Sequence, residues 1–466
     1  MASEPLRYAT ISELGTALRR RETSAVELAQ AALELLEAEG SPLNAVARLT
    51  PQVAQAQAEQ ADRELAEGRD RGPLHGLPYG AKDLLDTAGI GTEYGSPTHR
   101  GRVPSTDAAT VIRLRQAGAV LVAKLSMIPL AGGGGYGGPG ASLGGPVRTP
   151  WNTAHWAGGS SSGSGAAVGA GLLPFSIGSE TWGSIVCPAA FCGISGLRPT
   201  YGRVPSQGAM VLSWTMDKVG PLARSAADCA TVLRALDPTW TPLQSRSTGT
   251  RPLAGLRGGV IPRDYAHADP QTEGLFRAAV AVLADLGLTI EDAQLPAYPY
   301  ESVASTVVRA EGSAAFEDLI RGPELDTLPD EGQRRGLRAG LALTAVEYLK
   351  AMRVRAALQA DAAALFGQFD VLLSPTYLRV APPADVPFDD QFDGGDPLGA
   401  LGNLCGLPAI SVPMGYGPHG LPLGLCITGD VHAEATALAV AQAYQQASDW
   451  HSARSPSGQE NRGHGD

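Results

Sequence analysis

The sequence predicts an α/β fold in which helices cover both faces of a β-sheet. Short apolar runs bounded by glycine and proline are typical of buried strands, and segments with helical patterns separate these runs along the chain. Glycine and proline supply 58 and 35 of the 466 residues, which indicates many connections between elements. The hydrophobic share of 44% is sufficient for a large core.

The first elements are expected to be helices, within residues 10–70. Ser24 and Glu27 have the spacing of a capping box, and apolar residues follow them. Pro51 suits the first position of a helix, and the alanine-rich run to Glu67 predicts a second one. We therefore expect residues 1–70 to form N-terminal helices that pack on the core.

The buried strands are expected further along the chain. Residues 74–80 predict a strand that enters a turn, residues 107–116 a helix, and residues 119–123 a second strand. Residues 371–373 and 409–412 predict two more strands. Because these runs are continuously apolar rather than alternating, both faces of the sheet should be covered.

Composition excludes several classes of protein. The formal net charge of −11 provides no basic excess to neutralise phosphates, so no nucleic-acid partner is expected. The five cysteines are an odd number at scattered positions, which predicts neither a disulfide framework nor a zinc site. The start lacks the pattern of a secretory signal, and no run of 18 apolar residues occurs. We expect a cytoplasmic protein with no membrane partner, metal or cofactor.

Two glycine-rich blocks carry the candidate nucleophile. Residues 158–165 read GGSSSGSG and residues 178–185 read GSETWGSI, which places Ser160 and Ser184 24 positions apart. A serine hydroxyl is a poor nucleophile until a base removes its proton. The sequence therefore needs a base to accompany these serines.

Lys82 is the candidate base, as a lone lysine in the mostly uncharged stretch GLPYGAKD at residues 76–83. Burial disfavours the ammonium form, so a lysine among apolar residues can have a lowered pKa. Asp83 would oppose this if it pointed inward, but adjacent residues of a strand point to opposite faces. Taken alone, Lys82 would be a surface lysine, and only the blocks around it favour catalysis.

With these blocks the sequence resembles the amidase signature family. The stretches GISGLRPTYG at residues 193–202 and NLCGLPAISVP at 403–413 also look like blocks of that family. The resemblance implies one α/β/α domain around a large mixed, twisted β-sheet, at residues 71–452. Residues 240–335 match more weakly and would be a variable cap, and the polar residues 453–466 would form a disordered tail.

The resemblance also implies a Ser–cis-Ser–Lys triad, with Ser184 as nucleophile, Ser160 as bridging serine and Lys82 as base. The cis peptide would lie at Gly159–Ser160. Backbone N–H groups would converge on the developing oxyanion. The oxyanion hole is expected at Thr181, Trp182, Gly183 and Ser184. The acyl pocket is expected to be bordered by Ala131, Gly132, Gly133 and Trp182.

Three residues depart from the family pattern around the nucleophile. Trp182 stands where glycine is common, and Glu180 and Val186 replace the commoner Asp and Arg. The backbone donor survives at Trp182, so these changes affect the substrate rather than the mechanism. An indole facing the four glycines at 132–135 would form an aromatic wall opposite open space, which favours ring-bearing substrates. The alternative is that Trp182 fills the core behind the loop.

The sequence thus predicts a free-standing serine amidohydrolase that cleaves C–N bonds other than peptide bonds through an acyl-enzyme. Its expected partner is a small-molecule amide of the anilide or aryl type, with carbamates (a urethanase activity) and esters also open. The alternative is the glutamine-hydrolysing A subunit of a tRNA-dependent amidotransferase, which works with protein partners. The acyl group, the leaving group and the oligomeric state, including a homodimer, are not fixed by the sequence.

Three competing interpretations of the glycine-rich segments are weaker. Residues 159–163 match the G-x-S-x-G elbow of α/β-hydrolases with Ser161 as nucleophile, but no convincing strand precedes them. Residues 133–138 match G-x-G-x-x-G, but no helix-forming sequence follows, so a dinucleotide site is not expected. Finally, the serines at 160, 161, 162 and 164 could cap the following helix, which we expect of at least one.

Overall fold

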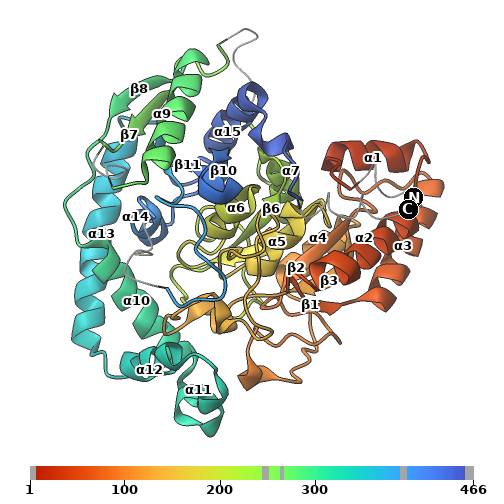
Figure 1. The fold of residues 1–466 in the computed structure, drawn as a ribbon, viewed down its shortest axis with the longest axis horizontal. Coiled ribbons are helices and arrows are strands. Elements are labelled where there is room, and N and C mark those ends of the chain that lie inside the picture. The colour runs from red at the N-terminus through yellow and green to blue at the C-terminus, as the bar shows by residue number, and fades with distance from the viewer. Residues whose placement is uncertain (1–6, 244–250, 263–266, 389–395, 457–466) are drawn as a thin grey trace.

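The computed structural model describes residues 7–243, 251–262, 267–388 and 396–456 (Figure 1). One mixed sheet of 11 strands runs through this part of the chain. Its strands are β1 (Val46–Leu49), β2 (Pro78–Lys82), β3 (Val120–Leu125), β4 (Phe175–Glu180), β5 (Ser195–Arg198), β6 (Lys218–Ala223), β7 (Arg257–Val260), β8 (Thr289–Asp292), β9 (Val371–Pro375), β10 (Ala409–Tyr416) and β11 (Pro422–Gly429).

Helices cover both faces of this sheet, which confirms the predicted α/β/α fold class. They are α1 (Ile11–Arg19), α2 (Ala25–Leu35), α3 (Pro51–Ala66), α4 (Ala109–Gln116), α5 (Ser162–Gly169), α6 (Val186–Cys192), α7 (Ala226–Leu236), α9 (Pro270–Asp285), α10 (Tyr300–Ala315), α11 (Glu317–Arg321), α12 (Glu331–Gly340), α13 (Ala345–Phe366), α14 (Gly399–Leu404) and α15 (Glu434–Ser448). In the described residues no helix is both long and apolar enough to cross a membrane.

The strand order is β1-β3-β2-β4-β6-β5-β10-β11-β9-β7-β8. Strand β2 runs parallel to its neighbours β3 and β4, whereas the central pairs from β4 to β9 are antiparallel. Strands β7 and β8 return to parallel pairing beside β9. Strands β2 and β4 are therefore adjacent and end at the same edge of the sheet, which brings the residues that follow them together.

The N-terminal helices form as the sequence predicts. Ser24 accepts a hydrogen bond from the Glu27 N–H group, and the Glu27 side chain accepts from the Ser24 N–H group, so the capping box is confirmed. Pro51 is the first residue of α3. Strand β1 interrupts the expected helical stretch 10–70, because residues 46–49 pair with β3 through backbone hydrogen bonds that composition does not reveal.

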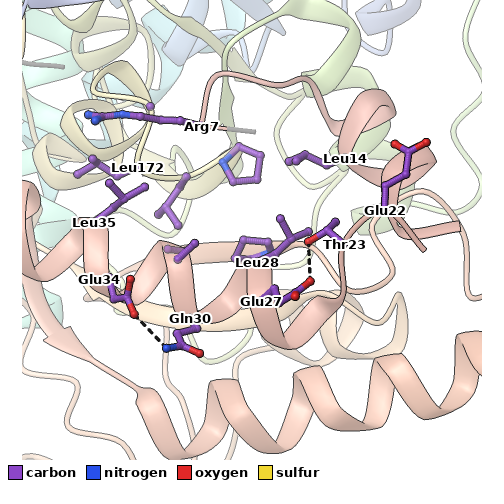
Figure 2. Close-up of a pocket in the computed structure, with 16 residues that line it drawn as sticks. Arg7, Leu14, Glu22, Thr23, Glu27, Leu28, Gln30, Glu34, Leu35 and Leu172 are labelled. Atoms are coloured by element: carbon purple, nitrogen blue, oxygen red, sulfur yellow. Dashed lines mark hydrogen bonds between the residues drawn. The ribbon is translucent and has the colours of Figure 1, made fainter. Parts of the chain in front are cut away.

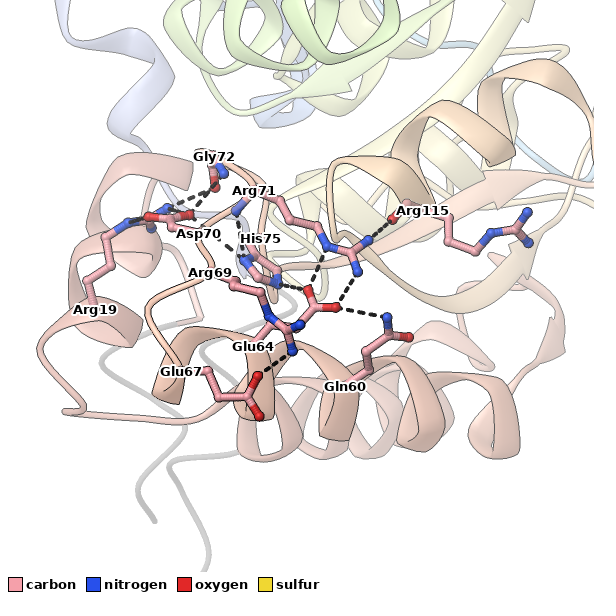
Figure 3. Close-up of polar contacts among 10 residues, drawn as sticks. All are labelled: Arg19, Gln60, Glu64, Glu67, Arg69, Asp70, Arg71, Gly72, His75 and Arg115. Atoms are coloured by element: carbon pink, nitrogen blue, oxygen red, sulfur yellow. Dashed lines mark hydrogen bonds and ion pairs between the residues drawn. The ribbon is translucent and has the colours of Figure 1, made fainter.

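The loop before β2 is held by charged contacts between α1, α3 and residues 69–75 (Figure 3). Arg19 of α1 pairs with Asp70 at 2.7 Å, and Arg71 Nε donates to Glu64 of α3 at 2.6 Å. The buried ring of His75 accepts the Arg71 N–H group at 3.1 Å. Residues 74–77 thus form a turn, and β2 begins at Pro78 rather than at the predicted residue 74.

A cavity of about 320 Å³ lies between α1, α2 and residues 171–174 (Figure 2). Leu28 of α2 and Leu172 line it from opposite sides, and Glu34 is one of its charged lining residues. None of the predicted catalytic residues lines it.

The weakly matching region 240–335 contributes both to the sheet and to a separate helical layer. Strands β7 and β8 lie within it and extend the main sheet, while α10 and α11 lie on the side of α12 and α13 (Figure 1). Residues 244–250 and 263–266 of this region lie outside the described residues. Of the predicted tail, residues 457–466 also lie outside them, and Ser455 is buried.

Candidate active site

Lys82, Ser160 and Ser184 come together at the adjacent ends of β2 and β4. Lys82 is the last residue of β2, Ser160 lies two residues before α5, and Ser184 lies in the turn between β4 and α6. Lys82 Nζ lies 2.8 Å from Ser160 Oγ, which lies 2.9 Å from Ser184 Oγ. The Gly159–Ser160 peptide is cis, as the resemblance implied.

Glycines let the segments that carry the two serines approach closely. A Cβ atom at Gly165 of α5 would lie 2.9 Å from the carbonyl oxygen of Pro188 in α6. A Cβ at Gly158 would lie 2.8 Å from Pro188 Cα. Because such contacts are closer than real Cβ atoms make, larger residues would separate α5 from α6 and move Ser160 away from Ser184.

Lys82 is fully buried, and burial is the main cause that lowers its pKa to about 7. The nearby carboxylates of Asp217 and Glu180 act in the opposite direction and raise it. Lys82 Nζ also lies 3.0 Å from Ser179 Oγ and 3.3 Å from Ser179 O. At neutral pH a substantial fraction of this amine is therefore uncharged and able to accept a proton.

The carboxylate of Asp83 faces away from Lys82, as the alternation along a strand predicts. It lies 3.6 Å from the buried Lys124 Nζ and accepts the Glu93 N–H group at 3.0 Å. Lys82 thus has no ion pair with its own neighbour in sequence, and its lowered pKa is not reversed by Asp83.

Ser184 is the member of the triad that a substrate can reach. Its exposed fraction is 7%, against 1% for Ser160 and 0% for Lys82. Gly183 has a φ of +82°, which turns the chain sharply before the serine and favours glycine. A Cβ atom there would also lie 2.9 Å from Tyr377 Oη. The turn therefore depends on glycine at 183, whereas it admits Trp at 182.

A buried ion pair beneath this turn fixes its geometry. Glu180 Oε2 accepts the N–H groups of Ile185 at 2.9 Å and Val186 at 3.1 Å. Its Oε1 accepts from Arg198 at 2.8 Å and from Asn403 at 3.1 Å. Burial alone would raise the pKa of Glu180, but Arg198, Lys218 and these donors lower it to about 2.

These contacts explain the two further sequence blocks, for which the sequence had suggested no role. Arg198 belongs to residues 193–202 and Asn403 to residues 403–413. Each block contributes one side chain that donates a hydrogen bond to Glu180. Asn403 lies more than 200 positions from Glu180 in the sequence. Their spacing in the sequence could not predict this, because the contact depends on β5 and α14 meeting in the fold.

Replacing Arg198 by methionine is expected to lower the free energy of unfolding by roughly 3–5 kcal/mol, because it leaves Glu180 charged and unpaired in the interior. Chemical denaturation of the variant beside the wild type would measure this loss. An exposed-pair variant, Arg277→Met, is the matched control, since Arg277 pairs with Glu273 on the surface of α9. An equal, small loss for both variants would contradict the account.

Residues 181–184 offer the unpaired backbone N–H groups that an oxyanion hole requires. The N–H groups of Trp182, Gly183 and Ser184 make no hydrogen bond to any described residue. The side chain of Thr181 is anchored instead, because its Oγ1 donates to Asp217 at 2.5 Å. Asp217 was not among the residues that the sequence analysis selected.

Trp182 is partly buried and packs against an apolar cluster beneath α10, α13 and α14. The cluster includes Val303, Leu358 and Leu401. This packing agrees with the alternative in which the indole fills space behind the loop, although the residue as a whole is only partly buried.

The glycine loop at 131–133 is tied to the bridging serine. The Ile128 N–H group donates to Ser160 O at 3.2 Å, just before the loop. A Cβ at Gly132 would lie 2.8 Å from the Tyr136 ring, and one at Gly133 would lie 3.0 Å from Leu212 and Phe316. Gly132 and Gly133 therefore allow close packing, whereas a Cβ at Gly135 would meet no described atom within 4 Å and would stand in open space. Ala131 has a φ of +55°, a conformation rare outside glycine.

The serines of residues 160–164 do not cap α5, and that expectation is wrong. The N-cap residue Ser161 makes no capping bond, because its Oγ donates to Ser179 O at 3.1 Å. Ser164 Oγ donates to Ile177 O at 3.3 Å. These hydroxyls fasten α5 to β4, which holds Ser160 against Lys82.

Within the described ranges, no three His, Cys, Asp or Glu side chains are grouped as a metal site requires. The five cysteines are free and buried.

The comparisons with known proteins agree with this geometry. The family model described as Amidase matches residues 27–438. The A subunit of glutamyl-tRNA(Gln) amidotransferase from Methylococcus capsulatus is 38% identical, over 96% of this chain and 99% of the relative. Native peptide amidase from Stenotrophomonas maltophilia is 32% identical, with a TM-score of 0.80 over 96% of this chain and 98% of that one. The A subunit of the same amidotransferase from Thermotoga maritima is 26% identical, with a TM-score of 0.77 over 95% of each chain.

The match of the family model covers most of the chain, and the blocks from which the resemblance was inferred form one site. The chain therefore belongs to the amidase signature family and is a hydrolase of carbon–nitrogen bonds.

Proposed function

We propose that this amidase hydrolyses a carboxamide through an acyl-enzyme on Ser184, and that the side-chain amide of glutamine represents its substrate class. The observation that carries the first part is the chain of hydrogen bonds from the buried Lys82 through Ser160 to Ser184. A lysine with a pKa of about 7 is a usable base at neutral pH.

The contacts of Lys82 support a relay through Ser160. A neutral amine has two N–H groups and one lone pair. The O and Oγ atoms of Ser179 can accept the two N–H groups, which leaves the lone pair for the Ser160 hydroxyl. Ser160 can then pass its proton to Lys82 while it accepts the proton of Ser184.

The proposed reaction follows from this arrangement. Ser184 Oγ attacks the amide carbon, and its proton moves through Ser160 to Lys82. The N–H groups of residues 181–184 stabilise the oxyanion of the tetrahedral intermediate. The proton then returns through Ser160 to the amide nitrogen, the C–N bond breaks and ammonia leaves. Water attacks the acyl-enzyme by the same relay and releases the carboxylic acid.

Two kinds of evidence favour glutamine over the anilides that the sequence suggested. Relatives named as the A subunit of glutamyl-tRNA(Gln) amidotransferase are 35–38% identical over nearly their whole length. In addition, the packing of Trp182 on an apolar cluster weakens the case for an aromatic wall. The comparisons thus support the glutamine-hydrolysing alternative, with protein partners, better than the free-standing aryl amidase.

Asp396 adds a structural argument for an acyl group that carries an ammonium. Its Oδ2 is buried and has no hydrogen-bond partner among the described residues, and it would lie 3.8 Å from a Cβ at Gly183 in the nucleophile turn. Burial is the main cause that raises the pKa of Asp396 to about 7. An unpaired carboxylate at this position would gain most from a positively charged group of the substrate.

The test compares glutamine with propionamide, which lacks the ammonium, in the wild type and in Asp396→Asn. We expect kcat/KM for glutamine to fall roughly 10-fold to 100-fold, while the value for propionamide changes little. Acetanilide, assayed in the wild type and in Trp182→Gly, tests the aryl alternative. The kcat/KM values for glutamine, propionamide and acetanilide are measured for the chain alone and again after addition of the partner subunits of an amidotransferase.

Equal losses for glutamine and propionamide would contradict the assignment of Asp396. The aryl substrate class would be supported instead of glutamine if the wild type hydrolysed acetanilide with a higher kcat/KM than glutamine in every assay. Trp182→Gly would also have to remove this preference.

A further inference from the structure

Asp217 lies at a junction between the nucleophile turn and the loop that precedes β6. Its Oδ1 accepts from Thr181 Oγ1 at 2.5 Å. Its Oδ2 accepts the N–H groups of Leu212 at 2.8 Å and Ser213 at 3.0 Å. One carboxylate therefore connects the first residue of the oxyanion stretch to residues 212–213, about 30 positions further along the chain.

The loop at 212–215 is itself held from the opposite side by the helical layer. Glu311 of α10 accepts the Thr215 N–H group at 3.1 Å and the Thr215 hydroxyl at 2.8 Å, and it also accepts from Ser213 Oγ. Tyr348 of α13 donates to Glu311 at 2.8 Å. Because residues 213 and 215 are fixed, the position of Asp217 relative to Thr181 is fixed as well.

Asp217 also lies on the side of the base, because it holds Thr181, which stands two residues from Ser179, and Ser179 Oγ lies 3.0 Å from Lys82 Nζ. It is the first carboxylate that opposes the effect of burial on Lys82, and Glu180 is the second. Glu180 is already paired with Arg198 at 2.8 Å. Burial raises the pKa of Asp217, and the hydrogen bonds from Thr181, Ser213 and Leu212 and the charge of Lys218 act in the opposite direction. Lys218 Nζ itself donates to the Met216 carbonyl.

We propose that Asp217 is a positioning residue that anchors Thr181 at the start of the oxyanion stretch and places a negative charge close to Lys82. The proposal rests on the proposed function, because it requires residues 181–184 to stabilise the oxyanion and Lys82 to act as base. It adds a residue that holds the transition-state donors in place and sets the pH range of the base.

The experiment compares Asp217→Asn with Thr181→Val in pH profiles of kcat/KM and in separate values of kcat and KM. Asparagine keeps its Oδ1 on the Leu212 and Ser213 N–H groups and donates its NH₂ group to Thr181 Oγ1, so Asp217→Asn removes the charge but retains the anchor. Removal of the charge should lower the pKa of Lys82, so the acid limb of the profile should move to lower pH, with a smaller change in kcat.

Thr181→Val removes the anchor but leaves the charge of Asp217 in place. It should lower kcat roughly 10-fold to 100-fold, with a smaller change in KM and an unmoved acid limb. The double variant should combine this lower kcat with the shifted limb of Asp217→Asn. Asp228→Asn is the matched control, because Asp228 is also buried and accepts the Ile11 N–H group at 3.1 Å away from the triad. It should leave the acid limb unmoved.

Normal kcat in a folded Thr181→Val variant would overturn the anchoring role. An unmoved acid limb in Asp217→Asn would overturn the electrostatic role. If Asp217→Asn does not fold, Thr181→Val with normal kcat still decides against the anchor, and Thr181→Val with low kcat decides for it. A Ser184→Ala variant that keeps its activity would instead refute the proposed function, whatever the two other variants show.

Discussion

The Ser184→Ala variant is expected to lose turnover by a factor of about 10⁴ or more, because it lacks the hydroxyl that forms the acyl-enzyme. Ser184 is the most exposed of the three triad residues, and its Oγ lies 2.9 Å from the buried Ser160 Oγ. Steady-state assays on glutamine and propionamide would measure the loss. Circular dichroism should show an unchanged fold, since alanine removes one hydroxyl from a position that is slightly exposed.

Ser161→Ala and Ser164→Ala are the matched controls for this variant. Ser161 is the nucleophile of the competing hydrolase interpretation, and in the structure its Oγ donates to Ser179 O. Ser164 donates to Ile177 O in the same helix-to-strand contact. Both variants should keep measurable turnover. Loss of activity in Ser161→Ala together with activity in Ser184→Ala would reverse the assignment of the nucleophile.

The Lys82→Ala variant is expected to lose nearly as much turnover, because Ser160 then has no group to accept its proton. In the wild type, kcat/KM should rise with pH through a midpoint near 7. The direction follows from the chemistry: the base must be neutral, burial lowers the pKa of Lys82 to about 7, and the neutral form predominates above that value. The pH profile should lose this limb in Lys82→Ala.

Lys124→Met provides the control for a buried lysine outside the triad. Burial lowers the pKa of Lys124 to about 8, and its Nζ lies 3.6 Å from Asp83. The variant should be less stable, because Asp83 loses its partner, but the folded protein should keep the midpoint near 7. A midpoint that disappears in Lys124→Met and persists in Lys82→Ala would contradict the assignment of the base.

The parts of the fold that the sequence predicted correctly depend on local patterns. The capping box at Ser24 and the proline at the start of α3 act within one helical turn, so their residues determine the outcome. The meeting of Lys82, Ser160 and Ser184 was inferred from blocks of a known family rather than from local pattern. Their catalytic roles stay predictions until the variants are assayed.

The contacts that the sequence did not reveal join distant segments. Asp217 reaches Thr181 across 36 positions, and Asn403 reaches Glu180 across 223. Strand β1 depends on its pairing with β3, and Pro78 begins β2 because the preceding loop is held by α1 and α3. The serines before α5 have the composition of helix caps, but β4 offers them carbonyl acceptors instead. In each case tertiary packing overrides the local preference.

The nucleophile is the central claim, and a covalent adduct tests it most directly. The protein is incubated with a fluorophosphonate, digested and mapped by tandem mass spectrometry, with Ser184→Ala and Lys82→Ala treated in parallel. The account predicts one adduct on Ser184 in the wild type, much slower labelling in Lys82→Ala and none in Ser184→Ala. An adduct on Ser161 with Ser184 unmodified would contradict it.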